Sequence, residues 1–196
     1  MILVTGATGF VGKNLVNFLL RENRHVRACV RRQQKDYLDS PLLEQFLVED
    51  LSQMLDWGKA LQDISVVIHT AARVHIMDDK EAVPLTEFRK VNTEGTLSLA
   101  KQAAEHGVRR FIFISSVKVN GEMTRPSNPF TPDDVHVPDD PYGLSKYEAE
   151  QGLLALIQET DMEVVIIRPP LVYGPGVKAN FSSMMKWMGK PVLPHN

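Results

Sequence analysis

The first twelve residues constrain the fold of this 196-residue chain more than any other segment. An apolar run at residues 2–4 leads into a turn that contains Gly6, Gly9 and Gly12, and a segment with helical apolar spacing follows. A strand, a glycine-rich turn and a helix in this order form the context that a dinucleotide-binding fingerprint requires. Gly6 permits a sharp turn, Gly9 a close approach of the backbone to a pyrophosphate, and Gly12 close packing of the helix on the strand. By itself this spacing also fits a turn that binds no ligand.

Short apolar runs alternate with longer helical patterns along the rest of the chain. The runs are nearly continuous in Val, Ile, Leu and Phe, which is typical of strands buried on both faces of a parallel sheet. The predicted strands are residues 1–4, 25–30, 45–49, 66–70, 109–114 and 163–168, and the predicted helices are residues 10–22, 52–61, 85–106 and 142–160. We therefore expect an α/β fold, a doubly wound parallel sheet of the Rossmann type with helices on both faces.

The length of the chain suits one domain and is marginal for two. A second domain of any size does not fit after residue 170, so either the fold is minimal or the chain is a truncated part of something longer. Residues 121–141 are rich in Pro, Asp and Asn and predict a long loop. Loops of that length in compact domains are more often functional than idle.

The composition excludes several classes of function. A net charge of −2 shows no basic excess, which argues against nucleic acid and against an anionic membrane surface as partners. No apolar run approaches the roughly 20 residues that a membrane-spanning helix needs, and no secretory signal precedes the first strand. Cys29 is the single cysteine and lies in an apolar run, so we expect a buried, inert thiol in a reducing, cytoplasmic setting.

A second group of residues carries acid–base chemistry. Tyr142 and Lys146 lie four residues apart, so a helix places them on one face, one turn from each other. A nearby ammonium group lowers the pKa of tyrosine from its usual value near ~10, which suits a general acid and base for alcohol–carbonyl interconversion. Ser115 and Ser116 end the fifth strand, at the edge where open α/β sheets bind ligands, and a serine there can hydrogen-bond to a substrate oxygen. Taken alone, the Tyr–Lys pair also fits a solvated helix face, and the serine pair also fits a simple turn.

Together these motifs resemble the extended short-chain dehydrogenases/reductases, and within them the NAD-dependent epimerase/dehydratase family in its UDP-hexose 4-epimerase branch. The TGATGFVG segment at residues 5–12, the serine pair and the Tyr-x-x-x-Lys motif carry the resemblance. Four further segments are similar to family motifs. Asp50-Leu51 resembles the Asp-Leu that faces the adenine, and His69-Thr70-Ala71-Ala72 resembles the H-x-A-A turn. Asn92-x-x-Gly95-Thr96 resembles the N-x-x-G-T helix motif, and residues 168–175 resemble the R-P-x-x-V-Y-G-P segment beside the nicotinamide. The matches run from residue 1 to about residue 176.

The resemblance implies a role for each matching residue. Tyr142 is the catalytic acid and base, Lys146 holds the nicotinamide ribose and lowers the pKa of Tyr142, and Ser116 is the catalytic serine, since it lies five residues before Gly121. Asn92 orders the central sheet and a water near the lysine. The implied cofactor contacts are Gly6, Thr8, Gly9, Phe10, Val11, Gly12, Arg31, Arg32, Asp50, Leu51, Ala71, Ala72, Asn92, Ser115, Tyr142, Lys146 and Pro169, and the implied substrate contact is Asn180. Asn120 stands where many members carry the tyrosine of V-Y-G, and it fits either a substrate contact or a residue that favours the turn before Gly121.

The chain departs from the family pattern at three places. Arg31 and Arg32 stand where NAD-preferring members carry an acidic residue, so NADP is an alternative to the NAD that this branch uses. The same two residues also fit solvated arginines, or one arginine stacked on the adenine. Val117 and Lys118 replace the Asp-Glu pair of the 4,6-dehydratases, which argues against dehydration. Family members also continue into a subdomain that recognises the sugar nucleotide. Residues 1–176 would therefore form the dinucleotide-binding domain, and residues 177–196 the start of a truncated substrate-binding segment.

The resemblance implies a nucleotide-sugar epimerase that acts at C4 of a UDP-hexose or UDP-N-acetylhexosamine by transient hydride transfer. Two alternatives remain open: an NADPH-dependent reductase of a keto-sugar or other carbonyl, and a non-catalytic dinucleotide-binding module. Family members often dimerise through two helices, which here are residues 85–106 and 142–160, so a homodimer is expected. We expect no metal site, because the histidines and the paired aspartates lack the spacing of metal ligands.

Overall fold

The computed structural model describes residues 1–48, 55–74, 84–124 and 126–174. These residues contain a parallel sheet of six strands in the order β3-β2-β1-β4-β5-β6. The strands are β1 (Ile2–Thr5), β2 (Val26–Val30), β3 (Leu43–Leu47), β4 (Val66–His69), β5 (Arg110–Ile114) and β6 (Glu163–Ile167). The expected doubly wound α/β fold is confirmed. The strand order reverses between β1 and β4, and open α/β sheets bind ligands at this switch point, beyond the carboxyl ends of the strands.

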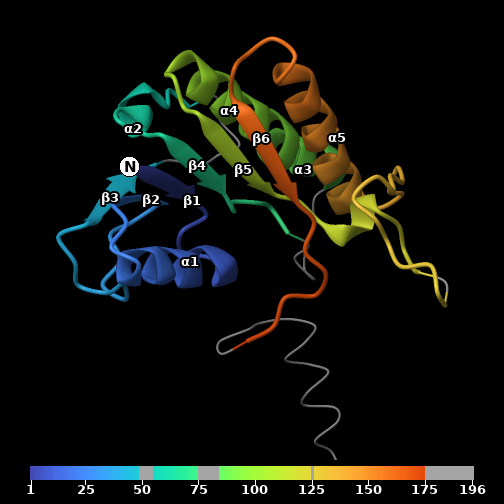
Figure 1. Cartoon of the computed structure of the whole chain (residues 1–196), viewed down its shortest axis with the longest axis horizontal. Coiled ribbons are helices and arrows are strands. Elements are labelled where there is room, and N and C mark those ends of the chain that lie inside the picture. Colours follow the sequence, from blue (N-terminus) through green and yellow to red (C-terminus); the bar gives the residue numbers. More distant parts are fainter. Residues whose placement is uncertain (49–54, 75–83, 125, 175–196) are drawn as a thin grey trace, which may run out of the picture.

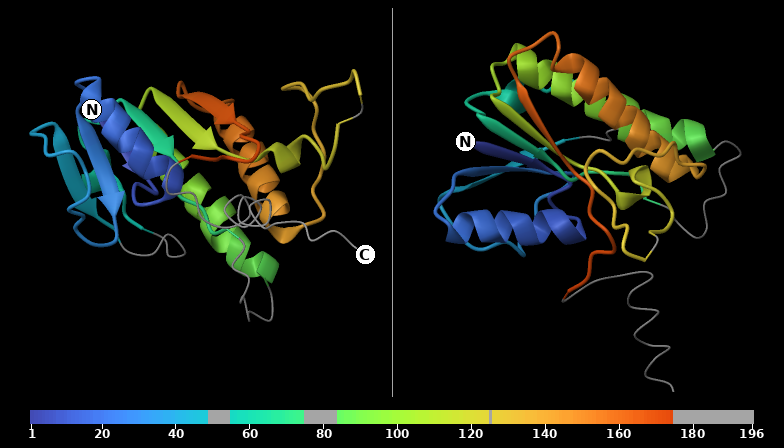
Figure 2. Two further views of the ribbon diagram at one scale, coloured as in Figure 1. Left: turned by 90° about the horizontal axis from the view of Figure 1, so that it is seen from below. Right: turned by 45° about the vertical axis from the view of Figure 1, so that its right-hand side comes forward.

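Helices cover both faces of the sheet. α1 (Phe10–Arg21) lies on one face, and α4 (Gly95–Glu105) and α5 (Pro141–Leu156) lie on the other (Figures 1 and 2). The shorter elements are α2 (Gly58–Leu61), α3 (Pro84–Phe88), the π-helical segment η1 (Arg89–Glu94) and the 3-10 turn η2 (Val117–Val119). None of the helices in the described ranges is both long and apolar enough to cross a membrane.

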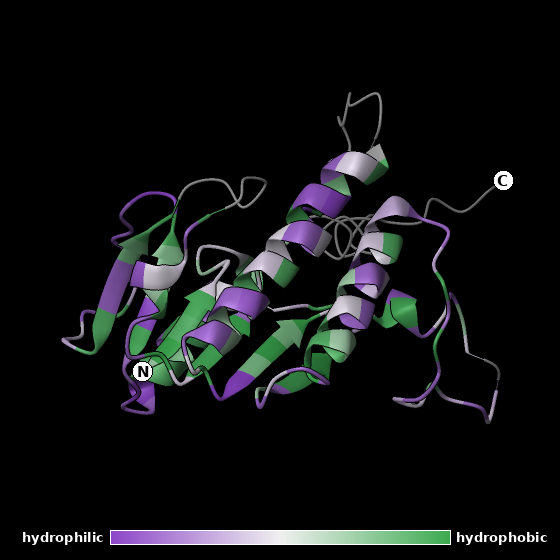
Figure 3. Cartoon of the chain, turned by 90° about the horizontal axis from the view of Figure 1, so that it is seen from above, coloured by the Kyte–Doolittle hydropathy of each residue, from purple (hydrophilic) through white to green (hydrophobic). Residues whose placement is uncertain are grey.

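The apolar side chains form one core on each face of the sheet, because successive residues of a strand point to opposite sides. In β1, Leu3 packs into the core beneath α4 and α5 together with Phe111 and Leu153, and Val4 packs into the core beneath α1 with Val16. Figure 3 shows hydrophobic strands below helices whose outward faces are largely hydrophilic. Strands β1, β2 and β4 are therefore largely buried between two layers, as their continuous apolar runs predict. The edge strands β3 and β6 have similar runs but contain exposed residues, so burial on both faces is not confirmed for them.

Four elements differ from the sequence prediction. The helix predicted at residues 142–160 is α5, which begins at Pro141 and ends at Leu156, four residues early. β3 lies two residues earlier than residues 45–49, because parallel pairing with β2 sets its register from Val26 opposite Leu43 to Val30 opposite Leu47. α2 begins at Gly58, so residues 55–57 of the predicted helix are not helical, and residues 52–54 lie outside the described residues. The predicted helix at residues 85–106 is divided by the π-helical turn η1.

Cys29 behaves as its sequence context predicts. It lies in β2 with 4% of its surface exposed, and burial raises the pKa of its thiol to about 12. A thiol that stays protonated at neutral pH is a poor nucleophile, so Cys29 is a core residue.

Candidate active site

The glycine turn brings the carboxyl ends of β1 and β4 against the start of α1. Gly6 has a φ of 63°, and a Cβ on it would lie 2.5 Å from the amide nitrogen of Ala71. A Cβ on Gly12 would overlap the carbonyl oxygen of Gly6, so only glycine lets the helix approach the turn this closely. Gly9 is the N-cap of α1, and its amide donates to the Gly6 carbonyl at 2.9 Å. The first turn of α1 thus presents free N–H groups at the switch point, a suitable place for a phosphate.

His69 links β1, β4 and α4 below this turn. Its Nδ1 lies 2.6 Å from the hydroxyl of Thr5, and its Nε2 lies 2.9 Å from the hydroxyl of Thr96. Because the Thr96 hydroxyl donates to the carbonyl of Asn92 at 2.7 Å, it accepts from His69, whose Nε2 therefore carries the proton. Burial, reinforced by the charge of Lys146, lowers the pKa of His69 to about 3. His69 is a neutral structural residue of the turn that resembles the family's H-x-A-A motif.

Asn92 is fully buried in η1 and directs its whole amide group to protein partners. Its Oδ1 accepts from the amide of Arg73 at 2.8 Å, and its Nδ2 donates to the carbonyl of Arg73 and the hydroxyl of Ser145, both at 3.0 Å. This side chain ties the segment after β4 to α5, beside Lys146. Asn92 is therefore a structural junction in this structure, and the cofactor contact expected of it is not seen in its hydrogen bonds.

Ser116, Tyr142 and Lys146 meet where β5 ends and α5 begins. The hydroxyl of Ser116 is near enough to that of Tyr142 to lower its pKa, and the ring of Tyr142 packs edge-on against Phe88 at a centroid distance of 6.2 Å. Lys146 is 1% exposed, and its Nζ lies 4.0 Å from the centre of the Phe113 ring. The structure thus brings together the three residues that the sequence predicts as catalytic.

The electrostatics of this trio differ from the expectation. The pKa of Tyr142 is raised, first by burial and then by the charge of Asp140, and the hydrogen bond from Ser116 offsets part of this effect. The sequence predicts the opposite direction, through the ammonium of Lys146. Burial also lowers the pKa of Lys146 to about 7, against the support of the Glu150 carboxylate, so its positive charge is itself weakened near neutral pH. The protein groups alone keep Tyr142 protonated, in the form that donates a proton.

The long loop predicted at residues 121–141 runs between Ser116 and Tyr142 at the carboxyl edge of the sheet (Figure 2). Asn120 donates through Nδ2 to the carbonyls of Thr131 and Asp134, both at 2.9 Å. The amide of Asn120 therefore shapes the loop, and the substrate contact expected of it stays a prediction. At the two ends of the loop, Lys118 Nζ lies 2.9 Å from a carboxylate oxygen of Asp140.

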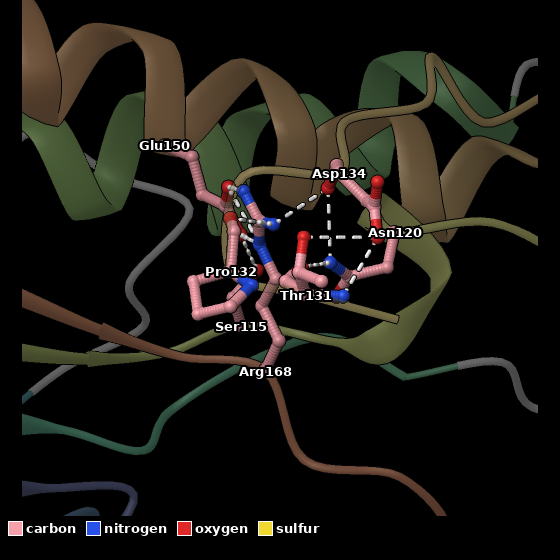
Figure 4. A network of polar contacts seen from close by, with 7 residues as sticks. All are labelled: Ser115, Asn120, Thr131, Pro132, Asp134, Glu150 and Arg168. Atoms are coloured by element: carbon pink, nitrogen blue, oxygen red, sulfur yellow. Dashed lines mark hydrogen bonds and ion pairs between the residues drawn. The ribbon is translucent and has the colours of Figure 1, made fainter. Parts of the chain in front are cut away.

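Ser115 also has a different partner from the one expected. It is 3% exposed, and its hydroxyl donates to the carboxylate of Glu150 on α5, whereas the cofactor contact expected of it stays a prediction. Sequence reasoning missed Glu150, which joins Ser115 to Arg168 (Figure 4). One signal pointed to it: Glu150 follows Lys146 by four residues and therefore shares the buried face of the helix.

The other predicted cofactor contacts lie around the switch point. Ala71 is buried, and the carbonyl of Pro169 accepts from the amide of Val117 at 3.1 Å. The partly or fully exposed ones are Thr8, Gly9, Phe10, Val11, Ala72, Arg31 and Arg32. Asp50, Leu51 and Asn180 lie outside the described residues.

Within the described ranges, no group of three or more His, Cys, Asp and Glu side chains is arranged to hold a metal ion.

The model of the NAD-dependent epimerase/dehydratase family matches residues 2–189 of the chain. A UDP-glucose 4-epimerase of Vibrio cholerae is 55% identical over 192 residues, which make up 97% of this chain and 57% of that protein. The structure of MoeE5 in complex with UDP-glucuronic acid and NAD is 32% identical, with a TM-score of 0.79 over 93% of this chain and 59% of that one. A UDP-glucuronic acid 4-epimerase of Bacillus cereus in complex with NAD is 28% identical, with a TM-score of 0.74 over 89% of this chain and 57% of that one.

The chain spans somewhat more than half the length of these relatives. The family match nevertheless covers almost every residue of the chain, and it includes the glycine turn, the serine pair and the Tyr–Lys helix described above. The chain therefore belongs to the NAD-dependent epimerase/dehydratase family.

Proposed function

We propose that this chain carries the cofactor-binding and catalytic part of a nucleotide-sugar 4-epimerase that uses NAD and acts on a UDP-hexose or UDP-N-acetylhexosamine. The observation that carries the proposal is the placement of Ser116 beside Tyr142, with Lys146 one turn further along α5, at the ligand-binding edge of the sheet. The identity to the Vibrio cholerae epimerase supports the reaction class. The UDP-sugar and NAD in the MoeE5 complex support the substrate class and the cofactor.

The glycine turn fits a dinucleotide, because Cβ atoms on Gly6 and Gly12 would fill the cradle between β1, β4 and α1. When bound, NAD would take a hydride from the sugar and return it to the opposite face. Tyr142 would take the proton of the C4 hydroxyl and later give it back, while Ser116 holds the same oxygen. Tyr142 is protonated in this structure, so it could take that proton only where the positively charged ring of oxidised NAD, together with Lys146, favours the phenolate.

The test is proton NMR of UDP-glucose and UDP-N-acetylglucosamine incubated with the chain and NAD. We expect the C4 epimer to appear without net formation of NADH.

Tyr142→Phe should lower turnover by about two orders of magnitude or more, because it removes the acid and base. Tyr147→Phe, on the same helix, is the matched control and should retain activity. Near-normal turnover in Tyr142→Phe would refute the proposed mechanism. Cofactor binding without turnover of either sugar would mean that the chain is only the cofactor half or belongs to a reductase; it would favour a non-catalytic dinucleotide-binding module only if the chain is shown to be genetically complete.

A reductase that uses NADPH is the second candidate, and one observation favours it. Arg31 and Arg32 are exposed and directly follow β2, which is the strand that pairs with β1 beside the glycine turn. Two guanidinium groups there suit the 2′-phosphate of NADP. Titration of both cofactors decides between the candidates: a strong NADP preference that disappears in Arg31→Asp would favour the reductase, and tighter binding of NAD would favour the epimerase.

We also propose a homodimer formed through α4 and α5, because the family often associates through these two helices. Light scattering of the chain tests this assembly, and a monomer at all concentrations would contradict it. The cytoplasmic location and the boundary of the dinucleotide-binding domain at residue 176 stay predictions from the sequence.

A further inference from the structure

A buried ion pair lies behind the catalytic trio. Glu150 follows Lys146 by one turn of α5, and its side chain is 0% exposed, whereas that of Arg168, just after β6, is 15% exposed. Nη2 of Arg168 lies 2.7 Å from Oε2 of Glu150, and Nε lies 3.1 and 3.2 Å from the two carboxylate oxygens. This is the two-point geometry that arginine forms and lysine does not.

The pair joins four parts of the chain (Figure 4). The carboxylate of Glu150 also accepts from the hydroxyl of Ser115, which precedes the catalytic Ser116. The remaining guanidinium nitrogen, Nη1 of Arg168, donates to the carbonyls of Pro132 and Asp134 at 3.1 and 3.0 Å. The end of β5, the end of β6, helix α5 and the 131–134 segment of the loop therefore all meet at one guanidinium–carboxylate pair.

The position of this loop matters because both of its ends border reacting groups. η2 begins directly after Ser116 and leads into the loop, and the loop ends at the N-cap of α5, two residues before Tyr142. The Asp134 carbonyl accepts from Asn120 as well as from Arg168, so the middle of the loop is held from two sides. The segment is therefore tied through the chain to the elements that carry Ser116 and Tyr142.

We propose that Arg168 and Glu150 are positioning residues: Arg168 clamps the 131–134 segment and the serine turn to α5, and Glu150 provides the buried negative charge that faces Lys146. The proposal rests on the proposed function only in that Ser116, Tyr142 and Lys146 are taken as the reacting groups. Replacement of a whole buried pair by apolar residues is often neutral or stabilising in other proteins, whereas loss of one partner is destabilising, so the tests below use variants that keep a polar or charged group at each position.

The charge of Glu150 matters because few other groups support a positive charge on Lys146. On its own helix Lys146 faces Glu150 and Tyr142, from β4 it faces His69, and from β5 the ring of Phe113. His69 stays neutral down to about pH 3, and Tyr142 stays protonated. Among these groups, the carboxylate of Glu150 is the anion that opposes the burial of the ammonium.

The clamp is tested by hydrogen exchange of backbone amides in Arg168→Lys. A lysine retains the charge beside Glu150 but cannot also donate to the Pro132 and Asp134 carbonyls. We expect the amides of Thr131, Asp134 and His136 to exchange about tenfold faster than in the unmodified chain, while β5 is unchanged. The control is Arg110→Lys, which alters the ion pair of Arg110 with Glu163 on the same two strands, away from the loop. Equal loop exchange in the two variants would overturn the clamp, whether or not the chain turns over a sugar.

The charge of Glu150 is tested by Glu150→Gln, whose one amide oxygen can still accept from Ser115 and from Nε of Arg168, but which carries no charge and no longer accepts from Nη2. NMR of the lysine side-chain nitrogens should then show Lys146 titrating about one pH unit lower than in the unmodified chain. If the chain is active, the alkaline limb of its kcat–pH profile moves in the same direction, because the ammonium is lost at lower pH. Glu163→Gln is the control and should leave both unchanged. An unshifted Lys146 in Glu150→Gln would overturn this half of the proposal, and the NMR titration needs no activity.

Discussion

At the scale of single residues, Asp140 combines two effects at the start of α5. Its Oδ1 accepts from the amide of Gly143 at 2.9 Å and caps the helix, and its charge is the second cause, after burial, of the raised pKa of Tyr142. Lys118 Nζ lies 2.9 Å from Oδ2 of the same carboxylate and partly neutralises it. Both side chains remain partly exposed, so solvent screens their influence on the tyrosine.

Substitutions on the two sides of this pair should shift the pKa of Tyr142 in opposite directions. Asp140→Asn keeps the helix cap but removes the negative charge, so the pKa of Tyr142 should fall. Lys118→Met leaves Asp140 without its counter-charge, so the pKa of Tyr142 should rise. We expect each shift to be smaller than about one unit because of screening. Titration of carbon-13-labelled tyrosine measures both, with the exposed Asp139→Asn as the control, and shifts of the same sign would contradict this account.

At the scale of secondary-structure elements, close contact between α1 and the glycine turn defines the cofactor site. Gly12 packs against the carbonyl of Gly6 and the side chain of Thr70, whose hydroxyl donates to the carbonyl of Thr5 at 2.7 Å. The backbone at this contact has little room to move, because β1 is paired on both sides, with β2 and with β4. The position of α1 is therefore set by the absence of a side chain at residue 12.

Gly12→Ala should displace α1 and weaken the site. The added methyl group meets backbone atoms of Gly6, so we expect a loss of about 1–3 kcal/mol in the free energy of unfolding and a marked loss of NAD affinity. Gly152→Ala in α5 is the matched control, because its methyl group would meet side-chain atoms of Leu97, which can rotate away. Urea unfolding and fluorescence titration with NAD measure the two effects. Equal affinity for NAD in both variants would show that α1 does not have to approach the turn so closely.

At the scale of the whole molecule, burial of titratable groups couples folding to pH. Burial lowers the pKa of Lys146 from 10.5 to about 7 in the folded chain. Between these two pH values the unfolded chain binds more protons than the folded one, so the free energy of unfolding rises with pH. Below about pH 7 both states are protonated and this contribution levels off. Cys29 and Tyr37, whose pKa values burial raises to about 12, act in the opposite direction at higher pH.

The chain should therefore become more stable between pH 7 and 8.5, a window that lies below the titration of Cys29 and Tyr37. The slope expected from Lys146 is at most about 1.4 kcal/mol per pH unit. Lys146→Met should flatten the slope, because it removes the titrating group, whereas the exposed Lys101→Met should retain it. Urea unfolding at several pH values measures this. A slope that persists in Lys146→Met would mean that another group is responsible.

The sequence by itself determined those features that depend on neighbouring residues. The continuous apolar runs identified the six strands, the glycine spacing located the nucleotide turn, and the four-residue interval placed Tyr142 and Lys146 on one face of a helix. These patterns are reliable because strand and helix periodicities are local properties of the backbone. The register of the edge strand β3 was two residues off, because pairing with β2 sets it and local composition does not.

Only the tertiary structure decided which partners the buried polar side chains take. Asn92 bonds to Ser145 53 residues away, Ser115 to Glu150 35 residues away, and Asn120 to Asp134 across 14 residues of loop. No local pattern encodes such contacts, since packing of distant segments brings them together. The same holds for the pKa of Tyr142, because burial and the placement of Asp140 outweigh the lysine that lies one turn away in the sequence pattern.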